Sequence, residues 1–164
     1  MNEQQRLFLV QARTDFAVFE VLRKNALLPS CHALHYLQMA TELLGKALAW
    51  RHGPPRRTHR SLVQFLRSLT SNQQAQSQLG FENQNQNWIH VIRKSVPLAE
   101  RVENLAPALC NDGPNAEYPW PNASPTNAPA EHTFDLWSDL QETAAGRQFL
   151  HLISRLFMTA ETFL

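Results

Sequence analysis

The segment RHGPPRRTHR, at positions 51–60, holds the densest group of side chains that could do chemistry. It contains four arginines and two histidines and no acidic residue. A guanidinium presents a planar fork of N–H donors that matches a phosphate group, and the start of a following helix would add free backbone N–H groups. The segment therefore predicts a site for a phosphate, a nucleotide or an RNA backbone. A solvated turn between two helices is the alternative.

The residues before this segment add a polar line at helical spacing. Its members are His35, Gln38, Glu42 and Lys46. Glu42 and Lys46 form an i,i+4 pair in the favourable order. His59 could hydrogen-bond back to this line, either as a functional group or as one that only orients its neighbours. The ligand-binding set that we expect is Glu42, Lys46, Arg56, Arg57 and His59.

Arg147 and His151 form a second constellation, which could serve catalysis. They are four residues apart and therefore share one face of a helix. An arginine can stabilise the charge of a phosphorane while a neighbouring histidine acts as acid or base. Chance also produces this spacing on a helix of such composition.

Metal and cofactor chemistry find little support in the sequence. His32 and His35 are three residues apart, but no third ligand stands at metal spacing and HExxH is absent. Cys31 and Cys110 lie far apart without a CxxC motif. Walker, GxGxxG and GxSxG motifs are absent as well. We therefore expect no metal site and no cofactor.

Aromatic side chains stand between prolines in the segment EYPWP (117–121). Tyr118 and Trp120 in such a stiff loop could pack against a core edge or an oligomer contact. They could also stack on a nucleobase.

The composition indicates one ordinary globular domain over residues 1–164, with 43% hydrophobic and 18% charged residues. The net charge is only +1, so nucleic-acid binding would depend on a local basic patch. No stretch of eighteen apolar residues could span a membrane, and the polar N-terminus does not resemble a signal peptide. We expect a cytoplasmic protein.

Apolar residues recur at the helical period along most of the chain, which predicts an all-α fold. Helices are expected over residues 2–25, 31–51, 59–69, 87–105 and 134–164. Ser30 and Thr58 are expected to cap the second and third helices. Residues 71–87, rich in Gln and Asn, predict a surface loop or a weak helix.

Three features modify this pattern. Pro97 is expected to kink or break the fourth helix, and Gly146 weakens the last one. Five prolines between positions 114 and 129 predict a stiff loop. The expected fold is an up-and-down bundle of four to five helices with a long proline-rich loop before the last helix.

Residues 32–69 combine a helix with an A-E-K-A-L pattern, a Gly/Pro turn and a T-H-x-x-L sequence. The residues concerned are Ala40, Glu42, Lys46, Ala47, Leu48, Gly53, Pro54, Thr58, His59 and Leu62. This segment resembles the HEPN family of small prokaryotic helical domains. The later AEYPWP sequence is loosely similar to a Tyr-Pro region that such domains often carry before their last helix.

The resemblance implies an up-and-down helical bundle that is often a homodimer, and the surplus of aromatic helix faces agrees with dimerisation. Many HEPN domains are metal-independent endoribonucleases with an Arg–His motif. Others are non-catalytic and bind nucleotides, RNA or partner proteins, commonly in toxin–antitoxin or defence loci. Arg147 and His151 are the nearest match to the catalytic motif, but the three residues between them are one too few.

The sequence therefore favours a divergent HEPN-like domain that binds a nucleotide, RNA or a protein partner. One alternative is a metal-independent endoribonuclease that uses Arg147 and His151 across a dimer. Another is a structural domain whose loops dock a partner and whose basic segment is inert.

Overall fold

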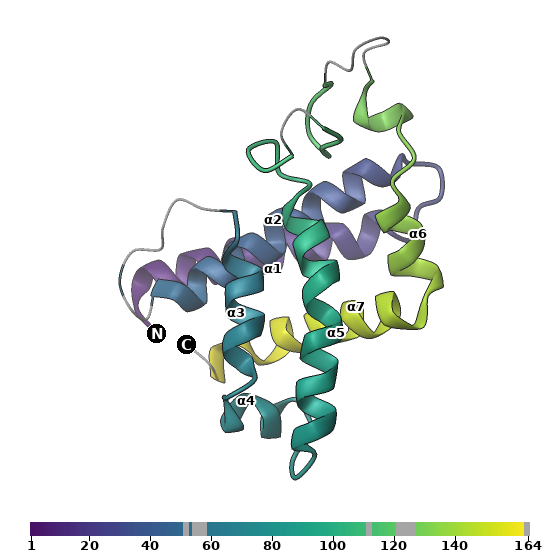
Figure 1. The fold of residues 1–164 in the computed structure, drawn as a ribbon. Helices are drawn as coiled ribbons and strands as arrows, with labels where there is room; N and C mark the ends of the chain where they lie inside the picture. Colours follow the sequence, from purple (N-terminus) through teal and green to yellow (C-terminus); the bar gives the residue numbers. More distant parts are fainter. Residues whose placement is uncertain (51–52, 54–58, 111–112, 121–126, 163–164) are drawn as a thin grey trace.

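Helices form all of the regular structure in the part of the chain that the structure describes (Figure 1). The computed structural model describes residues 1–50, 53, 59–110, 113–120 and 127–162. The α-helices are α1 (Glu3–Leu22), α2 (Ser30–Ala49), α3 (Ser61–Leu69), α4 (Gln73–Gln78), α5 (Asn85–Glu103), α6 (Asp135–Glu142) and α7 (Ala144–Thr159). Two short 3-10 helices are η2 (Pro129–Glu131) and η3 (Ala160–Thr162). Within these described ranges there is no β-strand, which confirms the all-α prediction.

The first two helices lie side by side (Figure 1). Asn2 and Gln5 form a capping box at the start of α1, in which each side chain accepts a hydrogen bond from the other residue's backbone N–H. The predicted cap of α2 is wrong by one residue. Pro29 occupies the N-cap position and Ser30 is already the first helical residue. The predicted cap Thr58 lies outside the described residues.

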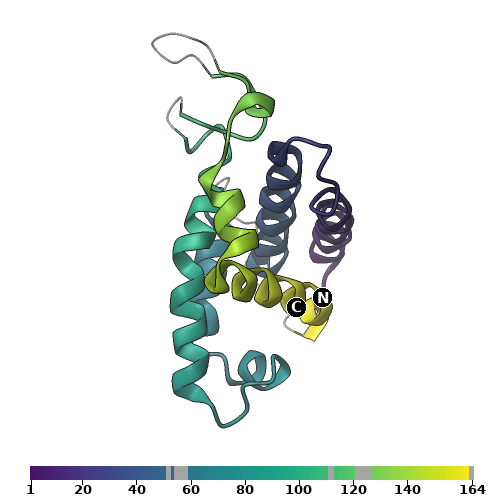
Figure 2. The same ribbon diagram turned by 90° about the vertical axis from the view of Figure 1, so that its right-hand side faces the viewer.

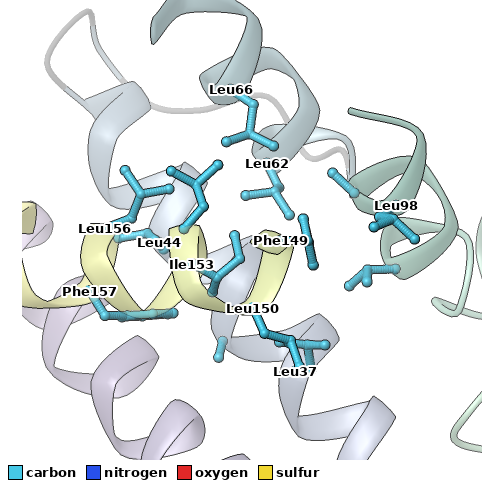
Figure 3. Close-up of a cluster of buried hydrophobic side chains, with 14 of the residues drawn as sticks. Leu37, Leu44, Leu62, Leu66, Leu98, Phe149, Leu150, Ile153, Leu156 and Phe157 are labelled. Carbon is cyan, nitrogen blue, oxygen red and sulfur yellow. The ribbon is translucent and has the colours of Figure 1, made fainter. Parts of the chain in front are cut away.

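Helix α7 lies at the centre of the hydrophobic core (Figure 3). Its side chains Phe149 and Ile153 are fully buried. The core side chains that surround it come from three helices and include Leu37, Leu44, Leu62, Leu66 and Leu98. On the remaining side, the rings of Phe16 in α1 and Phe157 in α7 stack with their centroids 4.3 Å apart. One helix therefore organises the packing of α1, α2, α3 and α5.

The predicted last helix is in fact two helices that meet at a corner. Thr143 has an extended backbone between α6 and α7, and its hydroxyl accepts a hydrogen bond from the N–H of Gly146 at 2.9 Å. A Cβ atom on Gly146 would lie 2.0 Å from the carbonyl oxygen of Asp139. Gly146 is therefore not a weak point in a long helix but the residue that lets α7 approach the end of α6.

Helix α5 runs through Pro97 without the predicted break. Proline removes the N–H donor for the carbonyl of Arg93, and both residues lie on the exposed side of the helix, where water can satisfy that carbonyl. The Gln/Asn-rich segment contains the short helix α4, held to the core by the buried side chains of Ala75 and Leu79. Of the two expectations for this segment, a surface loop or a weak helix, the structure shows a short helix.

The expected number of four to five helices is wrong, because α4 exists and the last helix is divided.

Residues 104–134 separate α5 from α6, and their described parts stand at one end of the molecule (Figure 2). Trp120 is buried there and exchanges two backbone hydrogen bonds with Asn127, whereas Tyr118 is exposed. None of the described helices combines the length and the apolar character needed to cross a membrane.

Candidate functional site

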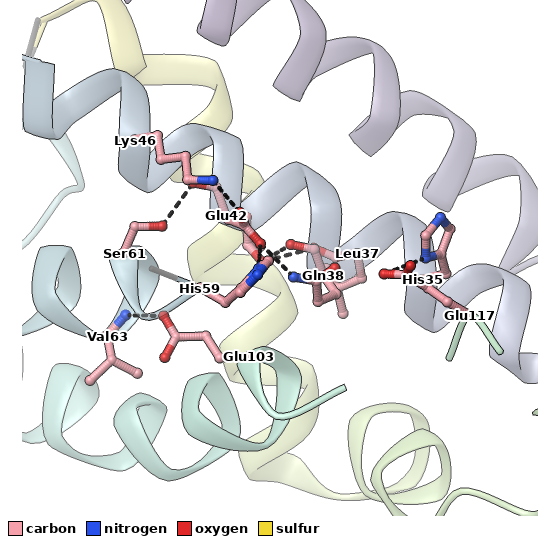
Figure 4. Close-up of polar contacts among 11 residues, drawn as sticks. His35, Leu37, Gln38, Glu42, Lys46, His59, Ser61, Val63, Glu103 and Glu117 are labelled. Carbon is pink, nitrogen blue, oxygen red and sulfur yellow. Dashed lines mark hydrogen bonds and ion pairs between the residues drawn. The ribbon is translucent and has the colours of Figure 1, made fainter. Parts of the chain in front are cut away.

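The centre of the candidate site is the carboxylate of Glu42, which α2 holds in a nearly buried position (Figure 4). Its Oε2 atom accepts a hydrogen bond from the amide of Gln38 at 2.8 Å and lies 2.6 Å from Nδ1 of His59. Its Oε1 atom accepts a hydrogen bond from the ammonium group of Lys46. One acid therefore holds three side chains, two of which can carry positive charge.

The charge of Glu42 is stabilised despite its burial. Burial alone would raise the pKa of this carboxyl group, but the hydrogen bonds from Lys46 and His59, together with their positive charges, lower it overall. Glu42 is consequently ionised at neutral pH. It fixes the positions of Lys46 and His59, whose side chains remain partly exposed at 20% and 38%.

The junction between α2 and α3 is unusually close because α2 carries a glycine there. A Cβ atom on Gly45 would lie 2.6 Å from the backbone carbon of Ser61, the first residue of α3. The hydroxyl of Ser61 donates a hydrogen bond to the backbone carbonyl of Glu42 at 2.8 Å. The beginning of α3 is thus fixed against α2, and His59, two residues earlier, reaches Glu42.

A second buried acid, Glu103 at the end of α5, occupies the N-terminus of α3. Its Oε1 atom accepts a hydrogen bond from the backbone N–H of Val63 at 3.0 Å. The pKa of Glu103 is raised to about 7, mainly by burial and to a smaller extent by the charge of Glu42, although the N–H groups of Val63 and Leu62 and the charge of Arg60 lower it. The prediction that this helix start offers free N–H groups to a phosphate is wrong at Val63, because Glu103 occupies its N–H.

The structure brings together three of the five predicted ligand-binding residues. Glu42, Lys46 and His59 form one hydrogen-bonded cluster, as their spacing indicated. The other two, Arg56 and Arg57, lie outside the described residues. They belong to the segment that leads from α2 to His59, so the chain connects them directly to the cluster.

The two predicted catalytic residues lie on α7, and Arg147 does not line the cavity that His151 lines. The guanidinium group of Arg147 donates a hydrogen bond to the carbonyl of Glu142 at 3.0 Å, at the end of α6. His151 is exposed and lines a cavity of about 240 Å³. That cavity is formed with Leu79, Gly80, Phe81, Val91, Gln148, Leu152 and Arg155.

His35, the first member of the polar line expected from the sequence, does not contact Glu42. Its Nδ1 atom lies 3.6 Å from Oε1 of Glu117, and Gln38 takes the neighbouring position beside Glu42 instead (Figure 4). Among the described residues there is no group of three or more His, Cys, Asp or Glu side chains that could hold a metal ion.

Sequence reasoning missed Glu103 and Ser61 as members of the site. Glu103 follows the buried residues Ile92 and Ala99 at helical spacing, so it is a carboxylate on the apolar face of α5. An acid in such a position needs a buried partner, and this signal could have indicated it. Ser61 depends on the close approach at Gly45, which no local sequence pattern reveals.

The chain was compared with models of protein families, with curated proteins and with solved structures, and none of the three comparisons found a match.

Proposed function

We propose that this chain is a divergent HEPN-like helical domain that binds the phosphate groups of RNA or of a nucleotide beside the α2–α3 junction, without cleaving them. The resemblance of residues 32–69 supports the family, and the arrangement around Glu42 supports the location of the site. The observation that carries the proposal is that one buried carboxylate holds Lys46 and His59 next to the arginine-rich segment.

Fixed cations bind a phosphate with less loss of side-chain entropy than flexible ones. Glu42 fixes Lys46 and His59 through hydrogen bonds, and Ser61 fixes the helix start from which His59 extends. Lys46 and His59 are thus ordered before any ligand arrives.

The sequence around the cluster is rich in basic residues. The permanently basic side chains that surround it in the sequence are Lys46, Arg51, Arg56, Arg57 and Arg60. No acid occurs between positions 51 and 60. A chain whose overall net charge is only +1 therefore carries a strongly basic segment at one place, which suits attraction of a polyanion.

Thermal unfolding in the presence of candidate ligands tests the proposal. A ligand that binds only the folded chain raises its stability by RT ln(1 + [L]/Kd). We expect ATP or a single-stranded RNA of mixed sequence to raise the melting temperature, and Arg57→Ala to remove most of that rise. Arg93→Ala, at an exposed position of α5, is the matched control. The absence of a rise with either probe would contradict the proposal and favour an interaction domain whose basic segment is inert.

A metal-independent endoribonuclease is the second candidate, and one observation favours it. His151 is exposed on the wall of a cavity, where it could reach a substrate, and Gln148 and Arg155 line the same cavity. In that function His151 would move the proton and Arg147 would stabilise the phosphorane charge. Arg147 would first have to leave the carbonyl of Glu142.

Incubation of labelled single-stranded RNA with the protein in EDTA distinguishes the two functions. Cleavage that is lost in His151→Ala would establish the nuclease and contradict a purely binding role. RNA that stays intact while it raises the melting temperature would support the binding domain.

A further inference from the structure

The cavity of about 240 Å³ beside α7 has an apolar wall that no function described so far uses. It lies between α7, α5 and the residues that follow α4, where α7 contacts α5 (Figure 1). The wall consists of the buried side chains Leu79, Val91 and Leu152, each only 3% exposed, and of the partly buried ring of Phe81. Pockets for drug-sized ligands measure about 300–1,000 Å³, so this cavity suits a small molecule with an apolar body.

The polar side of the cavity comes from one face of α7. Gln148, His151 and Arg155 are three and four residues apart and all line the cavity. Within the described part of the chain, the side chains of Gln148 and His151 form no hydrogen bond or ion pair. Arg155 donates one hydrogen bond, from Nη2 to the carbonyl of Gln78 at 3.2 Å, and a guanidinium carries further N–H donors. This face therefore offers donors to a ligand.

The cavity is formed before any ligand binds. Gly80 has a φ of 81°, and a Cβ atom there would lie 3.7 Å from Nη2 of Arg155, so the guanidinium lies close to bare backbone. The ring of Phe81 packs against the fully buried ring of Trp88, with 5.3 Å between the centroids. A site whose side chains are already held in place loses less conformational entropy on binding.

The charges around the cavity select the ligand. None of the described residues that line it is acidic, and Arg155 is their one permanent cation. We propose that this cavity binds a small monocarboxylate with an apolar body. The carboxylate group pairs with the guanidinium of Arg155 and accepts a hydrogen bond from His151, while the body lies against the apolar wall. A phosphate monoester carries almost two negative charges, for which the described lining residues offer no second permanent cation.

This inference goes beyond phosphate binding at the α2–α3 junction and does not rest on it. No residue of the Glu42 cluster lines this cavity. Failure of one proposal therefore leaves the other unaffected.

Fluorine NMR of para-fluorophenylacetate, titrated with the purified chain, tests the site. We expect saturable line broadening with a dissociation constant in the millimolar range. Phenylacetate should displace the probe. Acetate, which lacks the apolar body, and phenylacetamide, which lacks the charge, should displace it at least about tenfold less well. A probe that does not bind, or equal displacement by either control compound, would overturn the proposal.

Two variants locate the binding on α7. Arg155→Gln should weaken binding of the probe about tenfold or more, because it removes the charged partner of the carboxylate. His151→Ala changes an exposed side chain and should weaken binding by a smaller factor. Lys94→Gln, which removes an exposed cation of α5 outside the cavity, should bind like the wild type. Circular dichroism checks that each variant is folded. Wild-type affinity in both variants of α7 would overturn the proposal.

Competition with single-stranded RNA of mixed sequence separates this site from the nuclease alternative, in which His151 would face RNA. RNA that leaves the bound probe in place supports a separate carboxylate site. Displacement of the probe by RNA in the wild type would assign the cavity to RNA and overturn the proposed ligand class.

Discussion

The carboxylate of Glu103 accepts a hydrogen bond from the backbone N–H of Val63 at 3.0 Å, across forty residues of sequence. This contact gives α3 a cap that its own sequence does not provide, since its N-cap residue Arg60 forms no side-chain capping hydrogen bond. It also buries the carboxyl group of Glu103 where the end of α5 meets the start of α3. The stability of the junction therefore depends on the protonation of Glu103.

The contribution of Glu103 to the free energy of unfolding should fall as the pH rises from about 4.5 to about 7. Burial raises the pKa of this group from 4.5 to about 7, so the folded chain binds a proton that the unfolded chain releases in this window. The full effect is about 3 kcal/mol. Denaturant unfolding of the wild type and of Glu103→Gln across this pH range measures it, and the variant should lack this slope.

Glu100→Gln is the control for this measurement, because it removes an exposed acid from the same helix. Its pH dependence should follow that of the wild type, apart from a small loss of the exposed ion pair with Arg67. Equal pH slopes for the wild type and Glu103→Gln would show that Glu103 is not the group concerned.

Replacement of Glu42 should show the opposite pH dependence. The pKa of Glu42 is lowered in the folded chain, so its stabilisation is complete at pH values well above 4.5 and disappears as the pH falls through the lowered pKa. Glu42→Gln should cost about 2 kcal/mol at neutral pH, because Lys46 and His59 lose their charged partner. Denaturant unfolding of the wild type and of Glu42→Gln at pH 7 and at pH 3 measures this loss of stability under both conditions. A loss of the same size at both would contradict the role of the carboxylate charge.

Substitution of Gly146 should destabilise the corner between α6 and α7. Alanine normally stabilises a helix by about 1 kcal/mol relative to glycine, but here its Cβ would meet backbone atoms of Asp139 and Leu140 at 2.0 and 2.6 Å. Backbone atoms cannot turn aside, so Gly146→Ala should lose about 3 kcal/mol or more of unfolding free energy. Thermal unfolding checks this, with Ala145→Gly losing only about 1 kcal/mol. A stabilised Gly146→Ala variant would show that the two helices are not in close contact.

The sequence predicts the long helices well because their packing follows a regular apolar period. The expected ranges 2–25, 31–51, 59–69 and 87–105 agree within two or three residues with α1, α2, α3 and α5. The division of the last helix could not be seen in the same way. Apolar residues recur at helical spacing on both sides of Thr143, and the corner results from a close contact between Gly146 and Asp139 that only the fold creates.

The candidate site was predictable where its residues are neighbours on one helix. Glu42 and Lys46 form a local pair, and the return of His59 to this pair could be inferred from a short connection. The contribution of Glu103 could not, since it comes from α5 and meets α3 only after the helices have packed. Local sequence spacing thus indicated Lys46 and His59. The second acid, Glu103, joins the site only through the packing of α5 against α3.

Binding of a fluorescently labelled, single-stranded RNA of mixed sequence, followed by anisotropy at several salt concentrations, tests the central claim most directly. We expect saturable binding that weakens with salt, and Arg57→Ala should weaken it and reduce the salt slope by about 0.7. Arg93→Ala should bind like the wild type. Competition with ATP shows whether a nucleotide occupies the same site. RNA that fails to bind and ATP that fails to raise the melting temperature, or binding unchanged in Arg57→Ala, would contradict a phosphate site beside the α2–α3 junction.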